Sequence, residues 1–91
     1  MPKIKKIHWG NSFKRAYKKR VAGKPDENLF AEHFKLFIED PFDPILRTHK
    51  LSGKLDGLWS FAVSFDCRVI FEFLSAIEIL LIDIGSHKEV Y

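Results

Sequence analysis

The sequence lacks the features of a secreted or membrane-spanning protein. It contains one cysteine, Cys67, so no disulfide can form within the chain. It also has no long apolar stretch and no early apolar segment of the kind found in secretory signal peptides. These absences argue against secretion and against insertion into a membrane. We therefore expect a protein of the reducing cytoplasm, with no membrane association.

Acidic residues are missing from the first 25 positions, which carry nine lysines and arginines. The remaining positions hold six basic and twelve acidic residues, so the two parts carry charges of +9 and −6. A basic end attracts polyanions if the fold keeps its charges on one side, whereas the simpler interpretation is a solvated helix face.

The composition is that of a folded protein with one core. The 91 residues are 46% apolar and include nine phenylalanines, which is a heavy aromatic content for a small core. A chain of this length is large enough for one core but not for two. We expect a single domain that spans residues 1–91.

The first half of the chain predicts a strand and two helices. Residues 3–9 mix β-branched and aromatic side chains with lysines, which favours a short strand near a sheet edge. Apolar residues then recur at helical spacing on either side of Gly23, and Pro41 ends the second pattern. The expected buried stripes are Phe13, Ala16, Tyr17 and Val21 in the first helix and Phe30, Phe34, Phe37 and Ile38 in the second. Asn11 or Ser12 is the expected N-cap of the first helix and Asp26 that of the second.

The second half predicts strands. Short extended pieces over residues 46–57 precede three strands at about 59–65, 68–73 and 77–84. In the first of these three, Trp59, Phe61, Val63 and Phe65 alternate with small residues and form the apolar face. Strands joined by such short links pair as an antiparallel meander. The sequence thus predicts a two-layer α+β domain in the order βααββββ, with a helical hairpin packed on the sheet.

Chain direction brings several polar residues to one end of this sheet. Arg68 begins its strand and His87 follows the end of the antiparallel neighbour, and the turn at Asp66 lies at the same end. His49, with Lys50 and Lys54 close behind it, precedes the meander and is a candidate to fold over this end.

Such a cluster suits the cleavage of RNA. A base removes the proton of the 2′-hydroxyl, an acid protonates the leaving 5′-oxygen, and a guanidinium offsets the charge of the transition state. Histidine suits either proton-transfer role. His49, Asp66 and His87 are also conceivable metal ligands, but no close-spaced ligand pair supports a metal site, and we expect no cofactor. The alternative is that both histidines are ordinary surface or capping residues.

Four segments of the sequence resemble the RelE/ParE superfamily of type II toxins, and in particular its YafQ-like and RelE/StbE-type members. They are Thr48-His49-Lys50-Leu51-Ser52-Gly53, Gly57-Leu58-Trp59-Ser60-Phe61, Asp66-Cys67-Arg68-Val69-Ile70-Phe71-Glu72 and Ile84-Gly85-Ser86-His87-Lys88-Glu89-Val90-Tyr91. The resemblance covers nearly the whole chain, and the segments occur in the family's order.

The resemblance implies a ribosome-dependent mRNA interferase, a small endoribonuclease that cuts translated mRNA without a metal ion, and a cognate antitoxin that blocks it. It also implies that His87, His49, Asp66 and Arg68 are catalytic, with His87 as the general acid and either His49 or Asp66 as the base. The RNA-binding residues that we expect are Lys50, Lys54, Lys88, Tyr91, Lys14 and Lys18, the last two through phosphates of ribosomal RNA.

The chain departs from the YafQ-like pattern at Ala62, where such toxins carry a further histidine. This departure leaves two alternatives. One is a ParE-like inhibitor of DNA gyrase, which would need neither His49 nor His87. The other is a catalytically degenerate module that retains only antitoxin binding.

Overall fold

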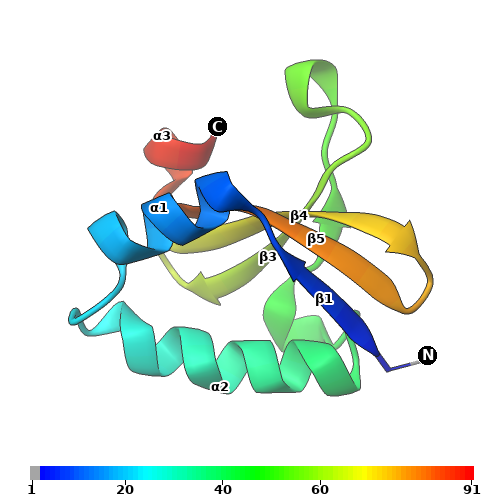
Figure 1. Cartoon of the computed structure of the whole chain (residues 1–91), viewed down its shortest axis with the longest axis horizontal. Helices are drawn as coiled ribbons and strands as arrows, with labels where there is room; N and C mark the ends of the chain where they lie inside the picture. Colours follow the sequence, from blue (N-terminus) through cyan, green and yellow to red (C-terminus); the bar gives the residue numbers. More distant parts are fainter. Residues whose placement is uncertain (1–2) are drawn as a thin grey trace.

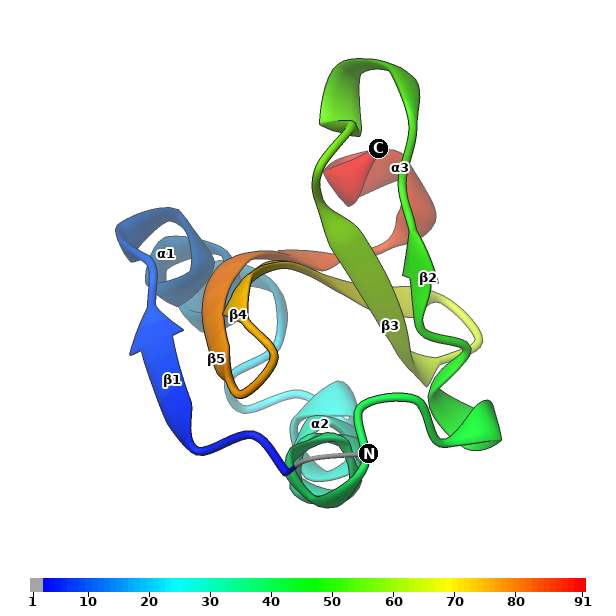
Figure 2. The same ribbon diagram turned by 90° about the vertical axis from the view of Figure 1, so that its right-hand side faces the viewer.

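In the computed structural model, which describes residues 3–91, two helices pack against a mixed five-stranded sheet (Figures 1 and 2). The order of strands across the sheet is β1-β5-β4-β3-β2. A short third helix follows the last strand. The elements are β1 (Lys6–Trp9), α1 (Asn11–Arg20), α2 (Asp26–Glu39), β2 (His49–Lys50), β3 (Trp59–Ser64), β4 (Cys67–Ser75), β5 (Glu78–Gly85) and α3 (His87–Val90), with single 3₁₀ turns at Pro44–Leu46 and Gly53–Leu55.

The predicted α+β class and the order βααββββ are confirmed. Strands β3, β4 and β5 form the expected antiparallel meander, and β2 adds a fourth antiparallel strand of two residues. The sequence did not reveal that β1 pairs in parallel with β5, with Lys6 opposite Glu78. Local patterns carry no information about a partner 72 positions away, so this pairing became visible only in the structure. Within residues 3–91 no helix is long and apolar enough to cross a membrane.

The core lies between the helical hairpin and one face of the sheet. Phe13 of α1 and the Phe30, Phe34 and Phe37 stripe of α2 are buried there, as predicted. Phe37 makes the central contact, stacking on Phe61 of β3 with ring centroids 4.5 Å apart. Figure 2 shows α2 below the sheet, while α3 and the loop after β2 lie above it. The cavity described below lies on this upper face, between α3 and the loop after β2.

The expected two-sided pattern of β3 is wrong in two respects. Ser60 and Ala62, assigned to the open face, are buried, because α3 and the loop after β2 cover that face. Phe65, assigned to the core, is 98% exposed. A register shift between Ala62 and Ser64 interrupts the alternation, and the chain then turns at Phe65 before β4 begins. A bulge of this kind re-aims the side chains that follow it.

The expected helix caps are also corrected. Gly10, not Asn11 or Ser12, is the N-cap of α1, and the hydroxyl of Ser12 instead donates to the carbonyl oxygen of Ile82. Pro25, not Asp26, precedes α2. Gly10 is required by close packing, because a Cβ there would lie 2.5 Å from the carbonyl oxygen of Leu81. Tertiary contacts with β5 thus override the local capping preference.

Candidate active site

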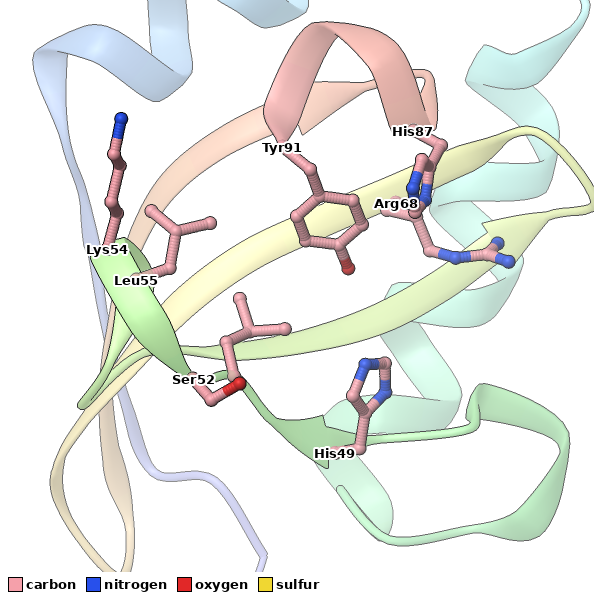
Figure 3. A pocket seen from close by; sticks show the side chains of 8 residues that line it. His49, Ser52, Lys54, Leu55, Arg68, His87 and Tyr91 are labelled. Atoms are coloured by element: carbon pink, nitrogen blue, oxygen red, sulfur yellow. The ribbon is translucent and has the colours of Figure 1, made fainter.

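A cavity of about 520 Å³ opens on the upper face of the sheet, between β2, the loop after it, β4 and α3 (Figure 3). Its volume is in the range of about 300–1,000 Å³ that is usual for ligand sites. Four of the residues that line it carry or can carry positive charge, and none of the lining residues is Asp or Glu. The lining residues are His49, Leu51, Ser52, Lys54, Leu55, Arg68, His87 and Tyr91.

His49 reaches the cavity from β2, where it pairs with Ser60 of β3. Its Nδ1 lies 2.8 Å from the carbonyl oxygen of Arg47. Since a carbonyl oxygen only accepts hydrogen bonds, the neutral ring carries its hydrogen on Nδ1. The lone pair of Nε2 is then available to take up a proton.

His87 is the first residue of α3, a helix that the sequence analysis did not predict after the strand at residues 77–84. The side chain of Ser86 accepts from the backbone N–H of Glu89, and the side chain of Glu89 accepts from the backbone N–H of Ser86. This reciprocal pair is a capping box. The Ser-x-x-Glu spacing of residues 86–89 is a known signature of it, so the helix start could have been read from the sequence.

Tyr91 closes the upper side of the cavity. Its hydroxyl donates to the hydroxyl of Ser60, at 2.8 Å, and so joins the chain after α3 to the middle of β3. The rings of Tyr91 and His87 meet at a steep angle, with centroids 4.5 Å apart. The aromatic contact fixes the orientation of the His87 ring, and Figure 3 shows both side chains together above the sheet.

Arg20, at the end of α1, anchors α3 from the other side. Its guanidinium donates to the carbonyl oxygen of Ile84, at 3.0 Å, and forms ion pairs with Asp83 and Glu89. These contacts cross from a helix to the junction of β5 and α3. The sequence analysis counted Arg20 only among the nine basic residues of the first 25 positions, and the packing of α1 along β5 reveals its inward role.

Arg68 lies in β4 opposite Ala62 of β3 and Gly85 of β5. One guanidinium nitrogen donates to the carbonyl oxygen of Ser64 at 2.7 Å. The side-chain contacts described for residues 3–91 leave the second terminal nitrogen and Nε of Arg68 without a partner. Two donors thus remain for an anionic ligand.

Asp66 does not join this group. It is exposed in the turn between β3 and β4 and lines a separate cavity of about 170 Å³ with Arg20, Ser86 and Glu89. Side chains alternate between the two faces along β4, and this places Arg68 on the upper face. Asp66 lies in the turn before β4, so the alternation does not apply to it. Its expected catalytic role stays a prediction that the geometry does not favour.

The expected RNA-binding residues occupy different places. Lys54 and Tyr91 line the cavity, and Lys54 stands at its rim beside Leu55 (Figure 3). Lys50 lies over the ring of Trp59, with its Nζ 5.9 Å from the ring centroid. Lys88 is exposed on α3, outside the cavity, and Lys14 and Lys18 are exposed on α1. The structure therefore divides these residues between the cavity and the outer surface.

Metal-ligating residues do not gather in the described part of the chain, since residues 3–91 hold no group of three His, Cys, Asp or Glu side chains able to share an ion.

Comparison with known proteins gives one family. The model of the family described as "Bacterial toxin of type II toxin-antitoxin system, YafQ" matches residues 5–91. No curated protein matches the sequence at a significant level.

Solved structures show the same fold. YafQ from E. coli strain BL21(DE3) superposes with a TM-score of 0.80 at 18% identity, over 96% of this chain and 98% of that one. The E. coli DinJ–YafQ toxin–antitoxin complex matches with a TM-score of 0.77 at 18% identity, over 96% and 97%. A copper-bound mutant toxin from Helicobacter pylori matches with a TM-score of 0.71 at 25% identity, over 94% and 98%.

Proposed function

Because the chain belongs to the YafQ family of bacterial toxins of type II toxin–antitoxin systems, we propose that it is an endoribonuclease that cleaves translated mRNA on the ribosome. One observation carries the proposal: His49, His87 and Arg68 line a single cavity, and none of the residues that line it is Asp or Glu. This set of side chains suits acid–base cleavage of a phosphodiester beside a polyanion.

His49 acts as the general base. With its hydrogen on Nδ1 toward the carbonyl oxygen of Arg47, its Nε2 accepts the proton of the 2′-hydroxyl. The 2′-oxygen then attacks the adjacent phosphorus. Asp66, which was the other candidate, lines a different cavity, and this favours His49 for the role.

His87 acts as the general acid. It donates a proton to the 5′-oxygen as the bond between phosphorus and that oxygen breaks. The cleaved strand ends in a 2′,3′-cyclic phosphate, and the released strand begins with a 5′-hydroxyl. The two donors of Arg68 that remain stabilise the negative charge of the phosphoryl oxygens in the transition state.

The missing family histidine at position 62 is compatible with this assignment. Ala62 lies opposite Arg68 and outside the lining of the cavity that holds His49 and His87. An acid, a base and an electrostatic group are all supplied by other residues.

A cognate antitoxin is the expected protein partner. The complex of E. coli YafQ with DinJ supports this expectation, since it shows a protein of the same fold bound to its antitoxin. We place the chain in the cytoplasm, where ribosomes and mRNA occur. Co-purification with the product of an adjacent open reading frame, and rescue of growth by that product, test the partnership.

The test of the activity is mRNA cleavage in a reconstituted translation reaction, with the ends of the fragments mapped. His87→Gln and His49→Gln remove acid–base groups, and we expect each to reduce the cleavage rate on the order of 10²–10⁴-fold. His8→Gln is the matched control, because it replaces a histidine of β1, at the other edge of the sheet, and keeps a donor for Glu78.

Undiminished cleavage by the His87 variant contradicts the proposal. Growth arrest with intact mRNA and an induced DNA-damage response would instead indicate a gyrase inhibitor. Binding of an antitoxin without cleavage by the unaltered chain would indicate a catalytically degenerate module.

A further inference from the structure

Arg68 lines a second cavity as well as the first. This cavity has a volume of about 330 Å³, and Phe65 of the β3–β4 turn and Ile45 and Arg47 of the segment before β2 contribute to its wall. Because Arg68 borders both cavities, the two cavities adjoin at this side chain. The two cavities are therefore neighbouring parts of one surface.

Phe65 is the most exposed large apolar side chain of the described residues, at 98%. One exposed apolar side chain is ordinary, but Phe65 lines the same cavity as Ile45, which is also exposed, and neighbouring exposed apolar side chains mark binding surfaces. The sequence pattern assigned this ring to the core. The register shift of β3 instead directs it into solvent. The fold thus builds the exposure of Phe65 into the β3–β4 hairpin.

The segment before β2, which lines the second cavity together with Phe65, also has an uncommon backbone conformation. Arg47 adopts a left-handed backbone, with φ of 51°, which is rare for a residue other than glycine. The preceding 3₁₀ turn presents Ile45, which is 64% exposed, and the carboxylate of Asp43 caps this turn by accepting from the backbone N–H of Ile45. A locally strained and capped segment holds an apolar and a cationic side chain beside the aromatic ring.

The ionisable residues of this cavity are all basic. They are Arg47, Arg68 and His33 of α2, and no Asp or Glu side chain lines it. An aromatic ring with cations around it is the combination that single-stranded nucleic acids require, since the ring stacks on a base and the cations contact phosphates. A protein segment rich in acidic and apolar residues is the alternative occupant, and the experiment below distinguishes it from RNA.

We propose that this second cavity is a subsite for a nucleotide that flanks the cleaved bond of the RNA strand. The base stacks on Phe65 and contacts Ile45, and the adjoining phosphate lies near Arg47. Arg68 marks the boundary between this nucleotide and the scissile phosphate. The inference rests on the proposed ribonuclease function, and it adds a recognition site that lies outside the catalytic cavity.

The experiment compares Phe65→Ala, Phe65→Leu and Phe65→Trp in three assays, the last of which measures binding of the co-purifying antitoxin. The first measures KM and kcat for mRNA cleavage on the ribosome. The second measures binding of a short single-stranded RNA, with a 2′-deoxy sugar at the cleavage position, to the free protein. Leu74→Ala is the matched control, because Leu74 is a half-exposed apolar residue near the far end of β4.

We expect Phe65→Ala to raise KM and to weaken RNA binding roughly 5- to 150-fold, the range for loss of one stacked base, with kcat little changed. Phe65→Trp keeps the stacking surface and should retain affinity. Phe65→Leu keeps an apolar side chain but no ring, and should behave like the alanine variant. Leu74→Ala should leave both constants unchanged.

Three results would overturn the subsite. They are equal behaviour of Phe65→Ala and Leu74→Ala, full affinity of Phe65→Leu, and a loss of antitoxin binding without any change in RNA affinity, which would assign the surface to a protein partner. Failure of the ribonuclease function is distinguishable from these results. In that case the unaltered protein leaves mRNA intact, while the RNA-binding assay still reports on Phe65.

Discussion

At the scale of single residues, the cavity depends on the hydroxyl pair that joins Tyr91 to Ser60. Ser60 is fully buried, and among the described residues its side chain has only Tyr91 as a partner. Tyr91 is 42% exposed, so water can take the place of Ser60 as its hydrogen-bond partner. Loss of this hydrogen bond should therefore cost more at the Ser60 hydroxyl, which water does not reach, than at the Tyr91 hydroxyl.

This inequality gives a prediction for stability. Tyr91→Phe leaves a buried hydroxyl unsatisfied and should lower the free energy of unfolding by about 1–3 kcal/mol. Ser60→Ala leaves only an accessible hydroxyl and should cost less, and adding Ser60→Ala to Tyr91→Phe should recover part of the stability. Urea unfolding of the three variants measures these values, and equal destabilisation by both single substitutions would contradict the argument.

Cys67 gives a second prediction at this scale. Desolvation by burial, with a smaller contribution from Asp26, raises the pKa of the thiol to about 12. Since the thiolate is the reactive form, alkylation by iodoacetamide at pH 8 should be roughly a thousandfold slower than in the unfolded chain. Mass spectrometry with and without guanidinium chloride follows the reaction. Rapid alkylation of the folded protein would show that Cys67 is accessible.

Sequence reasoning at this scale found the residues whose chemistry is distinctive. Chain direction placed Arg68 and His87 at one end of the sheet, His49 was a candidate to fold over that end, and the family resemblance added Tyr91. All four line one cavity. It did not find Ser60, because a serine in a strand has no pattern that distinguishes a buried partner from a surface residue. It also grouped Asp66 with the histidines, since chain direction indicates an end of the sheet but not a face.

At the scale of secondary structure, α3 carries His87 on a single helical turn. So short a helix has little stability of its own. It is held by the capping box, by Arg20 and by the Tyr91 hydroxyl. The position of His87, the proposed general acid, is thus determined by tertiary contacts rather than by helix propensity.

The stability of α3 should depend on pH through Glu89. The hydrogen bond from the backbone N–H of Ser86 lowers the pKa of Glu89, and Arg20 adds to the effect. A carboxylate with a lowered pKa in the folded state stabilises that state above its unfolded pKa, and the stabilisation is lost as the pH falls through the folded pKa. We therefore expect α3 to loosen on acidification, which the NMR shift of the Val90 amide measures.

Glu89→Gln should remove this dependence on pH, because glutamine does not titrate. Glu32→Gln, on the exposed side of α2, is the control and should behave as the unaltered chain does. The same acid transition in Glu89→Gln would show that another group is responsible.

Sequence reasoning at this scale identified the two long helices and the meander strands from their periodicity. It missed α3, because the apolar run over residues 77–84 indicated a strand, and the residues after Gly85 were interpreted as the polar end of that strand. The stretch between residues 46 and 57 was expected as short extended pieces, and it contains the two-residue β2 and a 3₁₀ turn. Elements of two to four residues are too short for a period to appear.

At the scale of the whole molecule, the basic residues of α1 lie outside the cavity. Lys14 and Lys18 are exposed, whereas Arg20 of the same helix is engaged by β5 and α3. The basic first quarter of the chain therefore has two roles. Part of it holds the fold together, and part remains available for phosphates.

This division predicts how ribosome binding responds to salt. Replacing Lys14 and Lys18 with glutamine should reduce the slope of log affinity against log salt concentration by about 0.7–0.9 for each phosphate that the variant no longer neutralises. The rate of cleavage in the bound complex should not change. Lys35→Gln on α2 is the control, and sedimentation with ribosomes at several salt concentrations measures the slopes. Unaltered slopes would show that α1 does not face ribosomal RNA.

The parallel pairing of β1 with β5 also determines when the molecule can fold. On a ribosome the chain emerges from its first strand onward, but the sheet partner of β1 is about 70 residues away. Until β5 has emerged, β1 has no neighbour and β4 presents an unpaired edge. Pairing across such a separation is slow to form. The sheet therefore cannot close before β5 has left the ribosome, and the cavity, which also needs α3 after β5, is completed last.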